Sequence, residues 1–147
     1  HLLRTINHEI SHLILRSAFK RPPNWINEGL AELFEYFSVV GEDIEVQTQN
    51  HKIRRVKSWL KEDEIDLSDF LQFTNKEWGK KNIKPDYYSS SLSYAIVYFL
   101  YIEHSGVIPG VLIEMNKGIS SIDSIEATYP GGFESFKSDF KRYFING

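Results

Sequence analysis

The stretch His8-Glu9-Ile10-Ser11-His12 places the strongest constraint on how this chain folds. Two histidines four residues apart lie one above the other only if the segment is helical, and both imidazoles can then bind the same ion. A carboxylate directly after the first histidine lies at the edge of that face, where it can hold a water molecule on the ion. The pattern predicts two zinc ligands, His8 and His12, and a general base, Glu9.

Aliphatic spacing predicts that the motif lies on a helix over residues 1–18. Apolar residues recur there at three- and four-residue steps and form one stripe, which we expect to face the core. At 100° per residue, His8 and His12 fall roughly opposite this stripe, and Glu9 falls on its flank. The stripe consists of Leu3, Ile6, Ile10, Leu13 and Ile14.

A second helix is predicted from Trp25 to about Phe37. The segment Lys20-Arg21-Pro22-Pro23 ends the first helix, because proline lacks a backbone donor and disfavours helical geometry in the residue before it. Asn24 is the expected cap of the second helix. Gly29 within it is small enough to let another helix approach closely.

The second helix carries two carboxylates on one face, Glu28 and Glu32, four residues apart. Two histidines and one carboxylate complete the ligand set of a catalytic zinc and leave a fourth position for water, and Glu28 is the best candidate for that ligand. Glu32 is placed to accept the other ring N–H of a ligand histidine. The alternative interpretation is an exposed acidic helix face.

The rest of the chain predicts further helices and one small hairpin. Alternating residues and a central turn indicate the hairpin between residues 38 and 50. A helix follows over residues 51–62, with Lys52 expected to point outward, and turn-forming residues predict a loop over 74–85. A strongly apolar helix over 87–103 is expected at the centre of the core. A stripe of aromatic residues predicts the last helix: Phe133, Phe136, Phe140, Tyr143 and Phe144.

The motif at His8–His12, the proline-rich turn and the stretch Trp25-Ile26-Asn27-Glu28-Gly29-Leu30-Ala31-Glu32 together resemble the glutamate-zincin metallopeptidases, in particular the peptidase MA-like group. The resemblance covers most of the chain, although only this first block carries chemistry. It implies that His8, His12 and Glu28 bind Zn²⁺, that Glu9 activates the water, and that Glu32 supports a ligand. It also implies a peptide or protein substrate.

One element of the family pattern is shifted in this chain. The family's central helix opens with a tyrosine whose hydroxyl stabilises the oxyanion of the transition state. The equivalent position falls near Ser90, so Tyr88 is our candidate for that donor, with Tyr87 as an option. The alternative for Tyr88 is a packed tyrosine between surface and core. The loop between the two motif helices is also shorter than in thermolysin-like enzymes.

The resemblance also implies a zincin-like, thermolysin-like helical subdomain that normally follows a β-sheet. Because His1 falls at the start of the motif helix, we interpret residues 1–147 as a single zincin-like peptidase domain truncated at its N-terminus, with the upstream sheet outside this chain. The expected architecture is therefore mainly α, with six to eight helices and at most a small hairpin.

Net charge and cysteine content argue against several classes of binding partner and ligand. The net charge of −3 indicates neither nucleic acid nor an anionic membrane as a partner, and no apolar run is long enough to span a bilayer. Cysteine is absent, which excludes thiolate ligands and cysteine nucleophiles. An extracytoplasmic location is implied by the family resemblance alone.

Three functional hypotheses follow from the sequence. The first is a zinc-dependent metallopeptidase that hydrolyses peptide bonds with zinc-activated water and Glu9 as general base. The second is a metal-binding but catalytically inactive helical module that acts in protein recognition. The third is a structural helical domain without metal. Metal content separates the third from the others, and peptide hydrolysis separates the first two.

Overall fold

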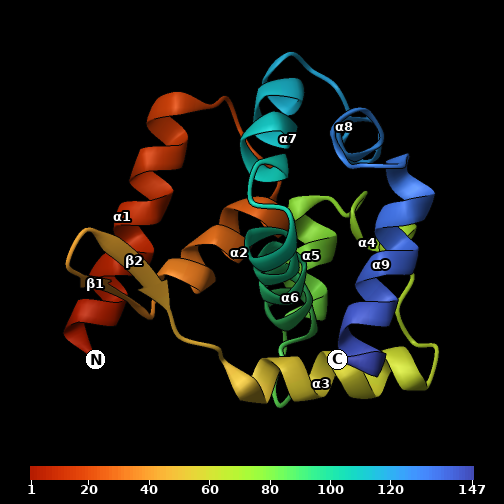
Figure 1. Cartoon of the computed structure of the whole chain (residues 1–147), viewed down its shortest axis with the longest axis horizontal. Coiled ribbons are helices and arrows are strands. Elements are labelled where there is room, and N and C mark those ends of the chain that lie inside the picture. The colour runs from red at the N-terminus through yellow and green to blue at the C-terminus, as the bar shows by residue number, and fades with distance from the viewer.

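Helix α6 (Tyr88–Glu103) forms the centre of the fold, as its apolar sequence predicted (Figure 1). The computed structural model describes residues 1–147. Almost every residue of α6 from Ser89 to Leu100 is buried, and the helix packs against α2, α3, α5, α7 and α9. A helix this apolar on all sides is stable only when other elements surround it.

The prediction of a mainly helical chain with a small hairpin is confirmed, although the structure has nine helices rather than six to eight. None of them is both long and apolar enough to cross a membrane. The elements are α1 (Leu2–Ala18), α2 (Asn24–Phe34), β1 (Phe37–Val40), β2 (Asp43–Val46), α3 (Asn50–Lys61), α4 (Leu67–Phe70), α5 (Asn75–Lys81), α6 (Tyr88–Glu103), α7 (Val107–Asn116), α8 (Ser121–Thr128) and α9 (Gly132–Asn146).

Gly29 brings α2 and α6 into close contact, as its size predicted. A Cβ atom at this position would lie 2.5 Å from Cγ2 of Val97 and 2.6 Å from the carbonyl oxygen of Ser93. Both distances are far below van der Waals contact, so only glycine fits here. This contact holds the helix that carries Glu28 directly against the centre of the core.

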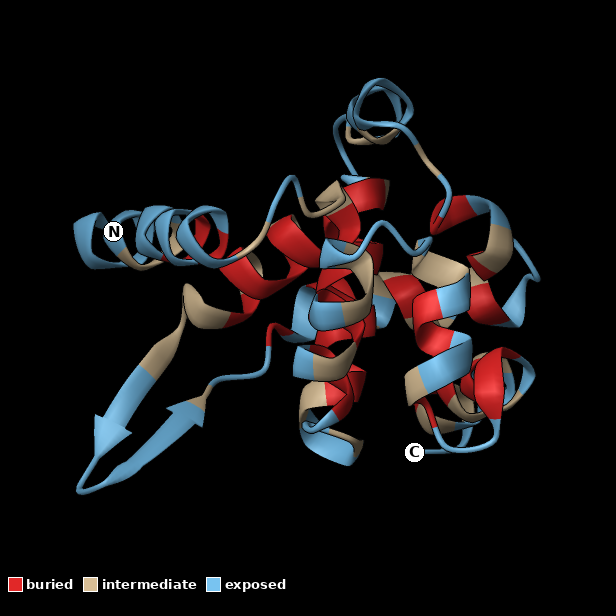
Figure 2. Ribbon diagram, turned by 90° about the horizontal axis from the view of Figure 1, so that it is seen from above, coloured by how far each residue is buried: buried red, intermediate tan, exposed pale blue.

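Helix α1 and the hairpin project from the helical body and are largely exposed (Figure 2). The antiparallel strands pair Phe37 with Val46 and Val40 with Asp43. In α1 only Ser11, His12 and Leu15 are buried, and they face α2. The expectation that the aliphatic stripe of α1 faces the core is therefore wrong. The members of the stripe are 43–67% exposed: Leu3, Ile6, Ile10, Leu13 and Ile14.

Three local predictions also differ from the structure. Residues 74–85 are not a continuous loop, because Asn75–Lys81 form α5, which Thr74 and Glu77 stabilise with a reciprocal capping box. Asn24 does not cap α2 but is its first residue, and Pro23 holds the cap position. The third difference concerns Lys52, which is buried rather than turned outward.

Candidate metal centre

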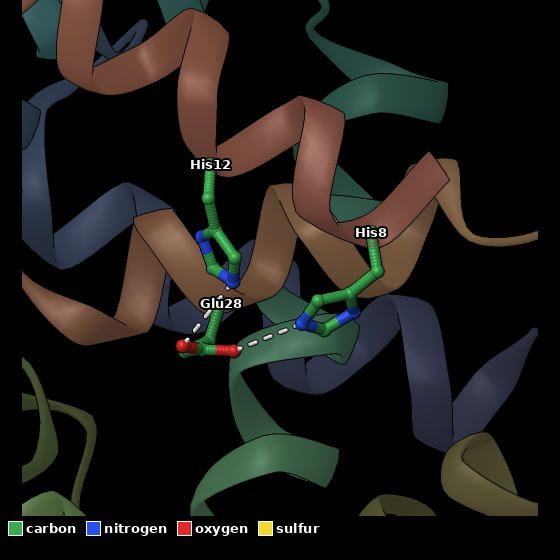
Figure 3. A group of neighbouring side chains, drawn as sticks. All are labelled: His8, His12 and Glu28. Atoms are coloured by element: carbon green, nitrogen blue, oxygen red, sulfur yellow. Dashed lines mark ion pairs between the residues drawn. The ribbon is translucent and has the colours of Figure 1, made fainter. Parts of the chain in front are cut away.

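The contact between α1 and α2 brings the predicted zinc ligands together. His8 and His12 project from successive turns of α1 toward Glu28 on α2, whose carboxylate lies between the two rings (Figure 3). Nε2 of His8 lies 3.6 Å from Oε2 of Glu28, and Nε2 of His12 lies 3.5 Å from Oε1. One ligand atom from each of the three residues falls within 4.8 Å of the other two.

The two separations leave room for an ion between the residues, and each joins a different oxygen of the Glu28 carboxylate to a histidine. Zinc binds histidine nitrogen and carboxylate oxygen at about 2.0–2.1 Å in a tetrahedral arrangement, which separates neighbouring ligand atoms by about 3.3 Å. The observed distances of 3.5 and 3.6 Å are close to this value. They exceed the usual length of an N–H···O hydrogen bond. The donor set of two imidazoles and one carboxylate is that of a catalytic zinc site.

Asn27 fixes the orientation of the His12 ring. Oδ1 of Asn27 lies 2.9 Å from Nδ1 of His12, and both side chains are buried. An amide oxygen only accepts, so Nδ1 carries a proton and donates it, and Nε2 is the ring nitrogen that faces Glu28, with a free lone pair when the ring is neutral. Neutral imidazole with a fixed tautomer is the form that binds zinc.

His8 lies among three carboxylates, two on α2 and one at Glu35, the residue that caps the C-terminal end of α2. Its Nε2 faces Glu28, and its Nδ1 lies 4.0 Å from Oε2 of Glu35. The contact with Glu28 is the main cause of a raised pKa for His8; burial opposes the rise, and the charges of Glu32 and Glu35 add to it. His8, Glu32 and Glu35 also group within 4.8 Å, counting one ligand atom each. The metal-free site therefore favours a protonated His8.

Glu28 remains a carboxylate in this setting. Burial would raise its pKa, but His8 and His12 outweigh that effect, and the charge of Arg16 adds to theirs, so that the pKa lies below the usual value. An ionised carboxylate is the form that binds a metal ion. The surrounding positive charges thus keep Glu28 ionised.

The structure gives Glu32 different partners from those predicted. Its carboxylate forms an ion pair with the buried ammonium of Lys52, and it accepts a hydrogen bond of 3.2 Å from Oγ of Ser90. No hydrogen bond joins Glu32 to a histidine ring, and for His12 the predicted role falls to Asn27. Glu32 thus lies near His8, but its carboxylate is bound by Lys52 and Ser90.

The predicted catalytic residues occupy different environments. Glu9 is exposed on α1 directly after His8. Tyr88 is packed: its ring contacts Trp59 and Phe70 at centroid distances of 5.0 and 6.0 Å. Burial, reinforced by Asp69 and nearby acidic residues, raises the pKa of Tyr88 to about 12. The pocket that Tyr88 lines contains none of His8, His12 and Glu28.

Tyr87, unlike Tyr88, lines a hollow that adjoins the candidate centre. Tyr87 lines a hollow of about 450 Å³ together with Glu32, Glu35 and Lys52. Two of these residues group with His8, so this hollow adjoins one side of the ligand set. Tyr87 has a positive φ of 47°, an uncommon backbone conformation for a residue with a side chain.

Sequence reasoning missed Asn27, Glu35 and Lys52, although Glu35 and Lys52 each carried a signal. Glu35 continues the face of Glu28 and Glu32 at a seven-residue step. Lys52 precedes Val56 by four residues and Leu60 by eight, so helical spacing places it on their buried face. Asn27 had no comparable pattern, because its role depends on the distance between two helices.

No family model, curated protein or solved structure matches the chain. The functional interpretation therefore depends on the residues and geometry described above.

Proposed function

We propose that the chain is a zinc-dependent metallopeptidase domain of the glutamate-zincin, peptidase MA-like type, which hydrolyses peptide bonds. The observation that carries this proposal is the convergence of His8, His12 and Glu28 within 4.8 Å of one another, from two helices. The three residues have the chemistry and spacing of a catalytic zinc site, and the next residue after His8 is a free carboxylate.

Zinc at such a site supplies a water molecule of lowered pKa and polarises the scissile carbonyl group. Glu9 takes the proton from the attacking water and delivers it to the leaving amine. Asn27 holds the tautomer of His12 in the form that keeps Nε2 unprotonated. Glu28 supplies negative charge to the site while its low pKa keeps it ionised.

Substitution of Glu9 by Gln tests this assignment. Because Glu9 is not a ligand, the Glu9→Gln variant should keep its zinc while hydrolysis of a broad peptide library falls by about a hundredfold or more. Glu45→Gln, an exposed carboxylate of the hairpin, is the matched control and should keep wild-type activity. Full activity in Glu9→Gln would show that another residue is the base.

A metal-binding module without hydrolytic activity is the second candidate. It is favoured by the position of Tyr88, whose ring packs on Trp59 and Phe70 and whose pocket is separate from the zinc group. This candidate predicts zinc binding equal to that of a peptidase, with no cleavage by wild type or by Glu9→Gln. The same library digest therefore distinguishes the two functions.

A further inference from the structure

A basic hollow adjoins the candidate metal centre on the side of His12. It has a volume of about 960 Å³ and lies around the connection between α1 and α2. Three cationic side chains line it, Arg16, Lys20 and Arg21, and no carboxylate does. In a chain of net charge −3, a hollow whose charged lining residues are all cations attracts anions.

The three cations are not used for internal ion pairs. Neither Arg16, Lys20 nor Arg21 takes part in any salt bridge of the structure, and all three are exposed. Asparagine side chains add further hydrogen-bonding groups to the lining, from Asn27, Asn75 and Asn116. The backbone N–H of Lys20 donates to Oδ1 of Asn116 over 2.9 Å, which anchors the connection to the end of α7.

Two residues connect the basic hollow to the metal centre. Asn27 lines the hollow and also holds His12. Arg16 follows His12 by four residues on α1, so it continues the row of His8 and His12 about 6 Å further along the helix axis. Its positive charge also acts on Glu28, where it contributes to the lowered pKa.

We propose that this hollow binds a carboxylate of the peptide substrate and that Arg16 is the residue that selects for it. The inference rests on the proposed peptidase function and adds its substrate class. An extended peptide advances about 3.4 Å per residue, so a displacement of about 6 Å places the carboxylate one or two residues from the attacked bond. The carboxylate is that of an acidic side chain or of the C-terminus, and a guanidinium binds either one with paired hydrogen bonds.

Peptide binding to the zinc-loaded Glu9→Gln protein tests the inference without requiring turnover. The probes are acetylated, amidated hexapeptides in which one position at a time carries Glu or Gln, and a pair that differs only in a free or amidated C-terminus. Calorimetry measures the dissociation constant of each. We expect the charged member to bind about tenfold tighter at one or two adjacent positions, or at the C-terminus, and the preference to weaken at high salt. The position of the effect identifies the source of the carboxylate.

Variants of Arg16 distinguish this hollow from the zinc ion, which also attracts carboxylates. Arg16→Gln should abolish the preference for the charged peptide, whereas Arg16→Lys should keep part of it. Arg54→Gln removes an exposed arginine of α3 and should leave the preference unchanged. Equal binding of both members of every pair, or a preference that survives Arg16→Gln, would overturn the inference. Neither outcome affects the proposed function, which wild-type zinc content and hydrolysis decide separately.

Discussion

His8 connects the protonation of the site to its metal affinity. In the metal-free protein its pKa is raised above the usual 6.5, chiefly by Glu28, against the effect of burial. Zinc binds only the neutral imidazole, so protons compete with the ion. We therefore expect zinc affinity to begin falling at a pH above 6.5 as the pH is lowered. Competition with a chromophoric chelator across about pH 5.5–8.5 measures this, and a decline that starts only below pH 6.5 would contradict it.

The raised pKa of His8 and the lowered pKa of Glu28 determine how the stability of the metal-free protein depends on pH. The raised pKa of His8 means that its stabilising contribution is present below 6.5 and is lost as the pH rises through the folded-state value. The lowered pKa of Glu28 means that its contribution is present above 4.5 and is lost as the pH falls through the folded-state value. The His8–Glu28 pair thus stabilises the metal-free fold most between pH 4.5 and pH 6.5. Bound zinc would instead add stability toward higher pH, where protons no longer compete for His8.

Substitution of Lys52 tests the buried ion pair that holds Glu32 next to the candidate site. Its side chain is 9% exposed and pairs with Glu32, which is 15% exposed. Lys52→Met leaves that carboxylate without its cation, which should lower the free energy of unfolding by about 3 kcal/mol in urea titrations. Lys61→Met, at an exposed position of the same helix, should change it by less than about 0.5 kcal/mol. Equal effects of the two variants would refute the buried ion pair.

At the scale of elements, the contact between α2 and α6 depends on Gly29. Gly29→Ala places a methyl group against Val97 and the backbone of Ser93, and should destabilise the fold by about 1–3 kcal/mol. Gly79→Ala is the matched control, because Gly79 lies within α5 with no atom near its missing Cβ. Alanine is the better helix former, so the control should stabilise by about 0.5–1 kcal/mol. Thermal unfolding of both variants measures the difference, and similar shifts for the two would contradict the close packing.

Element boundaries show what local sequence can and cannot predict. The helix of His8 and His12, the hairpin and the central helix were predictable, because their periodicity and turn residues are local signals. The segment of α5 reads as a loop because Asn75, Gly79, Asn82 and Pro85 are turn-forming residues, but the capping box of Thr74 and Glu77 stabilises a helix there. The orientation of α1 was wrong for another reason. Periodicity identifies an apolar face, but only tertiary packing decides which face is buried.

At the scale of the whole molecule, α2 packs against the core and α1 packs against α2. α2 is fixed by the core through Gly29 and α6, and α1 adds the two histidines with little burial of its own. The convergence of His8, His12 and Glu28 could be predicted because a motif fixes their spacing along each helix. The contact of Asn27 with His12, the ion pair of Lys52 with Glu32 and the basic hollow depend on distances between different elements, which no local pattern contains.

The zinc content of the purified chain tests the central claim most directly. After removal of metals with a chelator and reconstitution, elemental analysis should find about one zinc ion per wild-type chain. Glu28→Ala and His12→Ala should each lose most of it, whereas Glu45→Ala should keep it. A wild-type chain that retains no zinc, or variants at His12 and Glu28 that retain as much as wild type, would contradict a metal centre formed by His8, His12 and Glu28.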